Sequence, residues 1–283
     1  MQLVQSAAEL TQIVESEKRL GKRVGFVPTM GALHQGHASL VKRAETESDF
    51  VVVSIFVNPL QFGAGEDFEK YPRTLGVDAR LLSDIGADVL FAPAVSDVYP
   101  TEGSVRKLRA GFLGEVFEGK TRPGHFDGML TVVNRLLDLV NPDVVFFGAK
   151  DAQQVALVRK MLNEQARAGE RAPIQMVECE TVRDEHGLAL SSRNRYLSTA
   201  QLVIARTLNL ALRAAAEFED RDEALSAGKA VLSPEARLDY LELVDADSFE
   251  ILESAKGKRA RLIIAAYVGE TRLIDNIFID RTS

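Results

Sequence analysis

Two histidines, His34 and His37, are the residues in this sequence best placed to do chemistry. The run 23–27 before them is apolar and reads as a strand, and apolar residues recur at helical spacing after His37. A strand, a glycine-bearing turn and a helix leave unpaired backbone N–H groups and the positive end of a helix dipole at the turn. Two histidines three residues apart on the first helical turn face the same way. We therefore predict a phosphate-binding site here.

Simpler interpretations of this pair stay open. The two histidines could lie on the surface at a helix start, or they could bind a metal, although no third ligand stands nearby in the sequence. The intervening Gly36 would allow a base or ribose to approach the backbone closely.

Two more segments carry groups suited to anions. In the segment 148–151, Lys150 would bring a point charge to a phosphate, and Asp151 could cap the next helix or touch a hydroxyl or a metal. In the segment 190–195, hydroxyls next to Arg193 form a candidate anion clamp. A solvated lysine and an ordinary polar loop are the alternatives.

Other polar residues that could contact a substrate are two glutamines and two short polar segments. Gln61 and Gln154 could hold a carboxylate or hydroxyl substrate, although a single glutamine of this kind is more often a surface residue. Arg122 and His125 lie in a proline- and glycine-bearing turn. Residues 71–74 with Asp78 could be a helix start with an exposed acidic residue.

The elements that must position these groups alternate between helix and strand. Strands are predicted at 23–27, 50–57, 88–91, 143–147 and 174–179, and helices at 6–20, 37–47, 75–85, 129–140 and 152–165. This alternation predicts an α/β fold with a parallel, Rossmann-like sheet, in which ligands bind at the carboxyl ends of the strands.

The pattern changes past about residue 180. Two helices, at 204–218 and 222–232, are followed by three strands without intervening helices, at 237–244, 261–268 and 273–280. We predict a Rossmann-like domain over residues 1–177 and a smaller α+β domain over residues 178–283.

Composition narrows the class of protein. The 283 residues are 46% hydrophobic, which suits a globular fold, and the net charge of −7 argues against a nucleic-acid partner. One cysteine, Cys179, cannot form an internal disulfide, which favours a reducing compartment. No apolar segment has the length of a membrane span, and the first residues do not read as a signal peptide. We expect a cytoplasmic protein with no membrane partner.

Six motifs, in this order, resemble those of the pantoate–β-alanine ligase family within the HxGH nucleotidyltransferase superfamily. They lie at residues 28–37, 54–62, 71–74, 122–126, 147–151 and 191–194. The resemblance implies ATP-dependent condensation of pantoate with β-alanine through a pantoyl-adenylate, with release of AMP and pyrophosphate. It also implies Mg²⁺, a homodimer formed by the first domain, and a second domain that acts as a lid.

The resemblance further implies site residues by motif position. ATP would contact Pro28, Thr29, Met30, Gly31, Ala32, Leu33, His34, Gln35, Gly36, His37, Gly148, Ala149, Lys150, Asp151, Val182, Leu190, Ser191, Ser192 and Arg193. Among these, the catalytic residues would be His34, His37, Lys150 and Arg193. Pantoate would contact Gln61, Gln154 and Met30, and Gln61 would also face β-alanine. Supporting residues would be Asn58, Tyr71, Asp78, Arg122 and His125.

One position departs from the family pattern. Ala152 follows Lys150-Asp151 where an aromatic residue is usual, which affects the expected packing of the next helix but not the phosphate lysine. Two rival functions remain: another adenylyl- or cytidylyltransferase of the same superfamily, and a nucleotide sensor without turnover.

Overall fold

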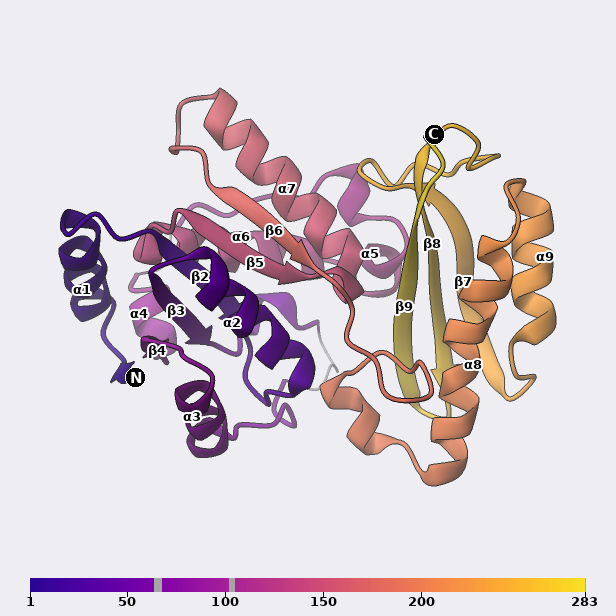
Figure 1. The fold of residues 1–283 in the computed structure, drawn as a ribbon, viewed down its shortest axis with the longest axis horizontal. Helices are drawn as coiled ribbons and strands as arrows, with labels where there is room; N and C mark the ends of the chain where they lie inside the picture. Colours follow the sequence, from indigo (N-terminus) through magenta and orange to yellow (C-terminus); the bar gives the residue numbers. More distant parts are fainter. Residues whose placement is uncertain (64–67, 102–104, 283) are drawn as a thin grey trace. The chain divides into compact units, whose positions relative to one another are not determined.

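The computed structural model describes residues 1–63, 68–101 and 105–282. The chain divides into two compact units, coloured indigo to rose and orange to yellow in Figure 1. Unit 1 contains residues 1–148 and 157–179. Unit 2 contains residues 149–156 and 180–283.

Unit 1 is built on a six-stranded sheet in which every pairing is parallel. The strands are β1 (Gln2–Val4), β2 (Val24–Thr29), β3 (Phe50–Ile55), β4 (Val89–Phe91), β5 (Val144–Gly148) and β6 (Gln175–Cys179). Their order is β1-β4-β3-β2-β5-β6. The central strands are nearly continuous apolar runs, as expected of strands that are covered on both faces.

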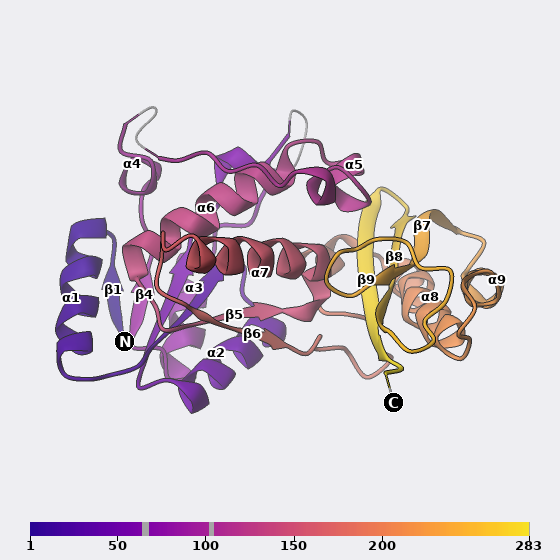
Figure 2. The same cartoon turned by 90° about the horizontal axis from the view of Figure 1, so that it is seen from above.

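Helices cover both faces of this sheet. They are α1 (Ala7–Arg19), α2 (Gln35–Glu47), α3 (Leu75–Asp84), α4 (Val95–Val98), α5 (Glu118–Thr121), α6 (His125–Val140) and α7 (Ala152–Arg167), with short 3₁₀ turns η1 (Pro59–Gln61), η2 (Phe112–Gly114) and η3 (Ala149–Asp151). Figure 2 shows α6 and α7 on one face of the sheet and α2 on the other. The apolar face of α2 packs on β2, β3 and β5 through Leu40, Val41 and Ala44.

The strand order places a switch point between β2 and β5. From β2 the chain proceeds outward through β3 and β4, whereas β5 and β6 lie on the other side of β2. In open parallel sheets, ligands bind outside the carboxyl ends of the strands at such a point. The turn that carries His34 and His37 follows β2 directly.

Unit 2 is a three-stranded antiparallel sheet with two helices. Strands β7 (Ala236–Asp245), β8 (Arg259–Val268) and β9 (Thr271–Asp280) pair in chain order. Helices α8 (Thr199–Ala216) and α9 (Arg221–Val231) pack on this sheet and on each other, and a 3₁₀ turn, η4 (Ser192–Tyr196), precedes them. Leu208, Leu212 and Ile264 belong to the shared apolar core.

The expected fold class, a parallel α/β sheet with a smaller α+β part, is confirmed. Element ends shift by a few residues: β3 ends at Ile55 instead of residue 57, because the following backbone turns into η1 through Asn58. The segment 149–156, between β5 and the middle of α7, groups with unit 2. The sequence carries no signal for this grouping, and the division at 177/178 with its domain roles stays a prediction. Among the described residues, no helix is long and apolar enough to cross a membrane.

Candidate active site

His34 and His37 close a reciprocal cap on the N-terminus of α2. The Gly36 N–H donates to Nδ1 of His34 at 3.1 Å, and the His34 N–H donates to Nδ1 of His37 at 3.3 Å. The two rings lie 4.2 Å apart between centroids. Because each Nδ1 accepts a hydrogen bond, each neutral ring carries its proton on Nε2. The cap therefore sets both imidazoles as Nε2–H donors at the positive end of a helix.

The glycine between them is required by the same cap. A Cβ atom at Gly36 would lie 2.8 and 2.9 Å from ring atoms of His34, closer than side chains approach. The imidazole of His34 therefore folds over residue 36 only when that residue is glycine. This local packing gives a reason for the glycine that holds with or without a bound nucleotide.

The turn before α2 is held by Asp78, which lies on α3. Asp78 is only 2% exposed, and its carboxylate accepts the backbone N–H groups of Ala32 at 3.0 Å and Leu33 at 2.9 Å. A third bond comes from Thr74 Oγ1. Ala32 has φ 51°, a left-handed conformation that costs energy for a residue with a Cβ atom. The interpretation of Asp78 as an exposed acidic residue is wrong, because the side chain is buried and its carboxylate accepts backbone N–H groups of the turn.

Gln61 is oriented by a chain of buried amides and a phenol. Asn58 Nδ2 donates to Gln61 Oε1 at 3.2 Å and to the Gly128 carbonyl at 3.1 Å. Asn58 Oδ1 in turn accepts from Tyr99 Oη at 2.9 Å. With its Oε1 occupied, Gln61 presents Nε2 as a donor, and this nitrogen lies 2.9 Å from Met30 Sδ.

Tyr99 was missed by the sequence analysis. It stands in a proline- and glycine-rich stretch with no readable periodicity, and it meets Asn58 only in the fold. Burial raises the pKa of its phenol well above the usual range, so the hydroxyl stays protonated and donates.

The other supporting residues of unit 1 lie around the same loop. Arg122 Nη1 is 3.1 Å from His125 Nε2, and His125 Nδ1 is 2.8 Å from the Gln61 carbonyl oxygen. Tyr71 is buried and packs edge-on against Phe62. The contact of His125 with Gln61 ties the loop after β3 to the start of α6, and it places Arg122 and His125 near Gln61.

The close approach of that loop to α6 depends on Gly128. A Cβ atom there would lie 2.0 Å from the Leu60 carbonyl oxygen, which leaves no room for a side chain. The backbone of η1 therefore rests directly on α6, and this contact brings the Gly128 carbonyl within reach of Asn58.

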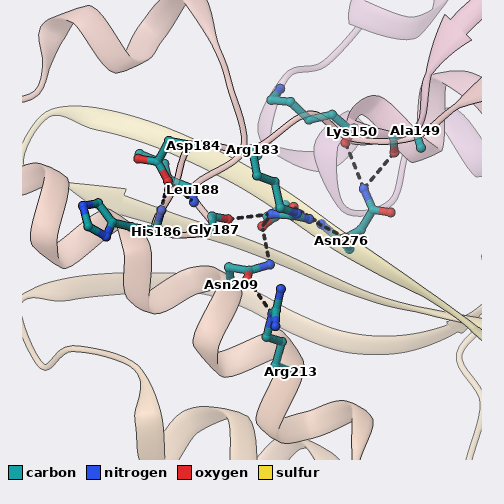
Figure 3. Close-up of polar contacts among 12 residues, drawn as sticks. Ala149, Lys150, Arg183, Asp184, His186, Gly187, Leu188, Asn209, Arg213 and Asn276 are labelled. Carbon is teal, nitrogen blue, oxygen red and sulfur yellow. Dashed lines mark hydrogen bonds and ion pairs between the residues drawn. The ribbon is translucent and has the colours of Figure 1, made fainter. Parts of the chain in front are cut away.

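In unit 2, the lysine segment is held by β9. Asn276 Nδ2 donates to the carbonyl oxygens of Ala149 at 2.9 Å and Lys150 at 3.0 Å, as Figure 3 shows. Lys150 Nζ lies 3.4 Å from Asp151 Oδ1, and the lysine side chain is 21% exposed. The lysine side chain is therefore partly covered by its surroundings.

The candidate anion clamp follows a short hairpin. The Leu190 N–H donates to the Val182 carbonyl, and Asp184 Oδ1 accepts from the N–H groups of His186 and Leu188 (Figure 3). Ser191 then caps η4 by accepting the Arg193 N–H at 3.2 Å. The structure thus brings the hydroxyl of Ser191 and the backbone of Arg193 together, with Ser192 between them.

The remaining predicted residues lie at the ends of these elements. Pro28 and Thr29 end β2, Gly31 forms the turn, and Gln35 begins α2. Gly148 ends β5. Gln154 is half-buried in the first turn of α7, and Ala152, the departure from the family pattern, is buried at its start. The helix forms with alanine at that position.

No protein cage for a metal ion is found among residues 1–63, 68–101 and 105–282: they contain no group of three histidine, cysteine or carboxylate side chains arranged for one.

A parallel sheet with a histidine-capped helix at its switch point defines a Rossmann-like, nucleotide-binding protein. A family model described as pantoate-beta-alanine ligase matches residues 2–278. A pantothenate synthetase from Nocardioides sp. is 48% identical, and the match covers 97% of this chain and 84% of that protein. The chain belongs to the pantoate–β-alanine ligase family.

Solved structures agree with the family. A pantothenate synthetase from Thermus thermophilus is 45% identical, with a TM-score of 0.88 over 98% of this chain and 99% of that one. A pantoate-beta-alanine ligase from Francisella tularensis, complexed with beta-gamma ATP and beta-alanine, is 35% identical, with a TM-score of 0.79 over 98% and 97% of the two chains.

Proposed function

We propose that this chain condenses pantoate with β-alanine at the expense of ATP, through a pantoyl-adenylate. The observation that carries the proposal is the reciprocal cap of His34 and His37 at the switch point of the sheet, in a chain that the family model matches over residues 2–278. The ligands of the Francisella tularensis relative, beta-gamma ATP and beta-alanine, support two of the three substrates.

The first step forms the adenylate. A carboxylate oxygen of pantoate attacks the α-phosphorus of ATP, the bond from that phosphorus to the bridging oxygen breaks, and pyrophosphate leaves with the electron pair. The nucleophile is already an anion, so the step needs positioning and charge stabilisation in place of a strong base. Preorganised donors of this kind are worth about 10²–10³ in rate each.

Unit 1 supplies the first set of donors. The Nε2–H groups of His34 and His37 are oriented by the cap, and we propose that they contact phosphate oxygens of ATP. The turn 28–33 and residues 35–36 would line the nucleotide. Gln61, whose Nε2 is presented as a donor, would hold the carboxylate or hydroxyl of pantoate beside Met30, and would face β-alanine in the second step.

Unit 2 carries the cations and hydroxyls that the family motifs assign to this reaction. We propose that Lys150 and Arg193 neutralise phosphate charge, with help from the hydroxyls of Ser191 and Ser192. Gly148, Ala149, Val182 and Leu190 would contact ATP through their backbone, and Gln154 would contact pantoate. Mg²⁺ would supply further charge neutralisation for the phosphates, and Asp151 is a carboxylate that could hold it.

The second step forms the amide. The amine of β-alanine loses a proton and attacks the acyl carbon of the adenylate, and AMP leaves with the electron pair of the broken C–O bond. An oxygen of the departing AMP is the candidate base. His37 is a poorer candidate, because the His34 N–H occupies its Nδ1 and its Nε2 already carries a proton. Because the mixed anhydride is prone to hydrolysis, we propose that residues 178–283 act as a closing domain. The homodimer through residues 1–177 and the cytoplasmic location likewise remain proposals.

Isotope exchange between ATP and pyrophosphate tests the adenylate directly. We expect labelled pyrophosphate to enter ATP only when pantoate is present, and without β-alanine. Exchange that needs a different carboxylic acid would indicate another nucleotidyltransferase of the superfamily. Binding of ATP without exchange in the presence of pantoate and Mg²⁺ would indicate a nucleotide sensor.

A further inference from the structure

Asn276, in the middle of β9, has every polar atom of its side chain committed. Its Nδ2 donates to the carbonyl oxygens of Ala149 and Lys150, and its Oδ1 accepts from Arg261 Nη1 at 2.8 Å. The residue is only 5% exposed. A flipped amide would turn Oδ1 towards two carbonyl oxygens and Nδ2 towards a guanidinium. The environment therefore allows one orientation of this amide.

The strand that carries Asn276 is itself fixed at the preceding residue. Asp275 has a side chain that is 4% exposed and forms two bonds with Arg183, at 2.6 and 2.8 Å. Arg183 also donates to the carbonyl oxygens of Gly187 and Asn276. Buried, doubly bonded pairs of this kind hold their backbone firmly. Asn276 thus projects from a point that the surrounding bonds determine.

The two carbonyls that Asn276 binds belong to the residues that set the direction of the Lys150 side chain. The turn η3 is three residues long and runs directly into α7, and 3₁₀ turns have poorer hydrogen-bond geometry than an α-helix. A long lysine side chain amplifies a small rotation of its backbone into a large displacement of its ammonium. Positional errors of about 1 Å at a reacting centre can cost about a hundredfold in rate.

We propose that Asn276 is a positioning residue for Lys150. Its two hydrogen bonds fix the backbone of the lysine segment, so that the ammonium reaches the phosphate site without a search through alternative conformations. This inference rests on the proposed function, in which Lys150 neutralises phosphate charge during adenylation. Asn276 itself touches no substrate in this account and acts only through the backbone of residues 149 and 150.

A double-mutant cycle separates positioning from simple stabilisation of unit 2. Pantoate-dependent ATP–pyrophosphate exchange is measured for the wild-type chain, Asn276→Ala, Lys150→Ala and the double variant. We expect Asn276→Ala to lower the exchange rate by about ten- to a hundredfold in the wild-type background. In the Lys150→Ala background the same change should lower it less than about twofold, because no ammonium remains to be positioned.

Two further variants provide the controls. Thr207→Ala removes a side chain of α8 in unit 2 whose Oγ1 donates to the Ile204 carbonyl and accepts the Ser233 N–H, away from Asp275 and the lysine segment. It should lower the thermal midpoint to a similar extent and leave exchange within about twofold of wild type. Asn276→Asp preserves side-chain volume and can still pair with Arg261, yet it sets an oxygen against two carbonyls, so it should lose exchange as Asn276→Ala does.

The outcomes are distinguishable. Equal losses in both backgrounds, or an equal loss in Thr207→Ala, would show that Asn276 acts only through stability. Unchanged exchange in Asn276→Asp with a wild-type midpoint would also overturn the inference. If the wild-type chain shows no pantoate-dependent exchange, the proposed function itself fails, and if Lys150→Ala keeps full exchange in an active enzyme, the role of the lysine fails.

Discussion

At the scale of single residues, His34 has two roles that can be separated. Its Nδ1 caps α2, while its Nε2–H is the proposed phosphate donor. A cap requires only a short side chain with an acceptor, whereas the phosphate contact requires a donor at the distance of an imidazole. Asparagine is a good N-cap residue, so it can restore the first role without the second.

Substitution of His34 tests this separation. His34→Ala should lower the free energy of unfolding by about 1 kcal/mol, since the Gly36 N–H loses its partner, and His34→Asn should recover most of it. Both variants should lose about 10²–10³ in the adenylation rate. Denaturant unfolding and pyrophosphate exchange measure the two effects. Full activity in His34→Asn would mean that the imidazole serves only as a cap.

The hydroxyl of Tyr99 offers a conservative test of the Gln61 network. Tyr99→Phe removes one hydrogen bond to Asn58 Oδ1 and leaves the ring in place. Without this bond, Gln61 is less well oriented, and pantoate binding should weaken by about 1 kcal/mol. The KM for pantoate should therefore rise about fivefold, with little change in kcat. The control is Tyr267→Phe in β8, which keeps the aromatic ring that lies against Arg237 of β7. An unchanged KM for pantoate would show that Asn58 orients Gln61 without the Tyr99 hydroxyl.

Cys179 gives a prediction that depends on pH. Burial raises the pKa of its thiol to about 11, and the reactive species is the thiolate. At pH 8 the native thiol should react with a disulfide reagent about a hundredfold more slowly than in the unfolded chain. The native rate should rise about tenfold per pH unit up to the pKa. Rapid labelling of the native protein at pH 8 would contradict this.

At the scale of elements, the sequence predicts those whose periodicity is set by burial. The runs that form β3 and β5 are apolar throughout, and α6 carries an apolar stripe, so each was found near its observed bounds. Contacts between elements were not predictable. Asp78 looks like an ordinary acidic residue on a helix start, and only the fold brings it to the amides of Ala32 and Leu33.

Asp78 tests whether α3 supports the nucleotide turn. Asp78→Asn replaces an oxygen that accepts backbone N–H groups with an amide that donates, so one buried amide loses its partner. The free energy of unfolding should fall by about 1–3 kcal/mol, and the KM for ATP should rise. Asp84→Asn, an exposed change near the other end of α3, should affect neither quantity. A stable variant with an unchanged KM for ATP would show that the turn before α2 keeps its conformation without the Asp78 carboxylate.

At the scale of the whole molecule, the sequence supplied the fold class, the family and the order of the motifs. The small antiparallel sheet was also readable, because three strands follow one another with no helix between them. The membership of residues 149–156 in unit 2 was not readable, since it involves contacts of η3 with β9, more than a hundred residues away, such as the bonds from Asn276. Local pattern carries no information about such a partner.

The measurement that bears most directly on the central claim is the release of AMP by the purified chain. With ATP and Mg²⁺ present, we predict steady AMP formation only when pantoate and β-alanine are both added, with one pantothenate formed per AMP. Steady AMP release that requires neither acid, or pantothenate formation with ADP as the product, would contradict the account.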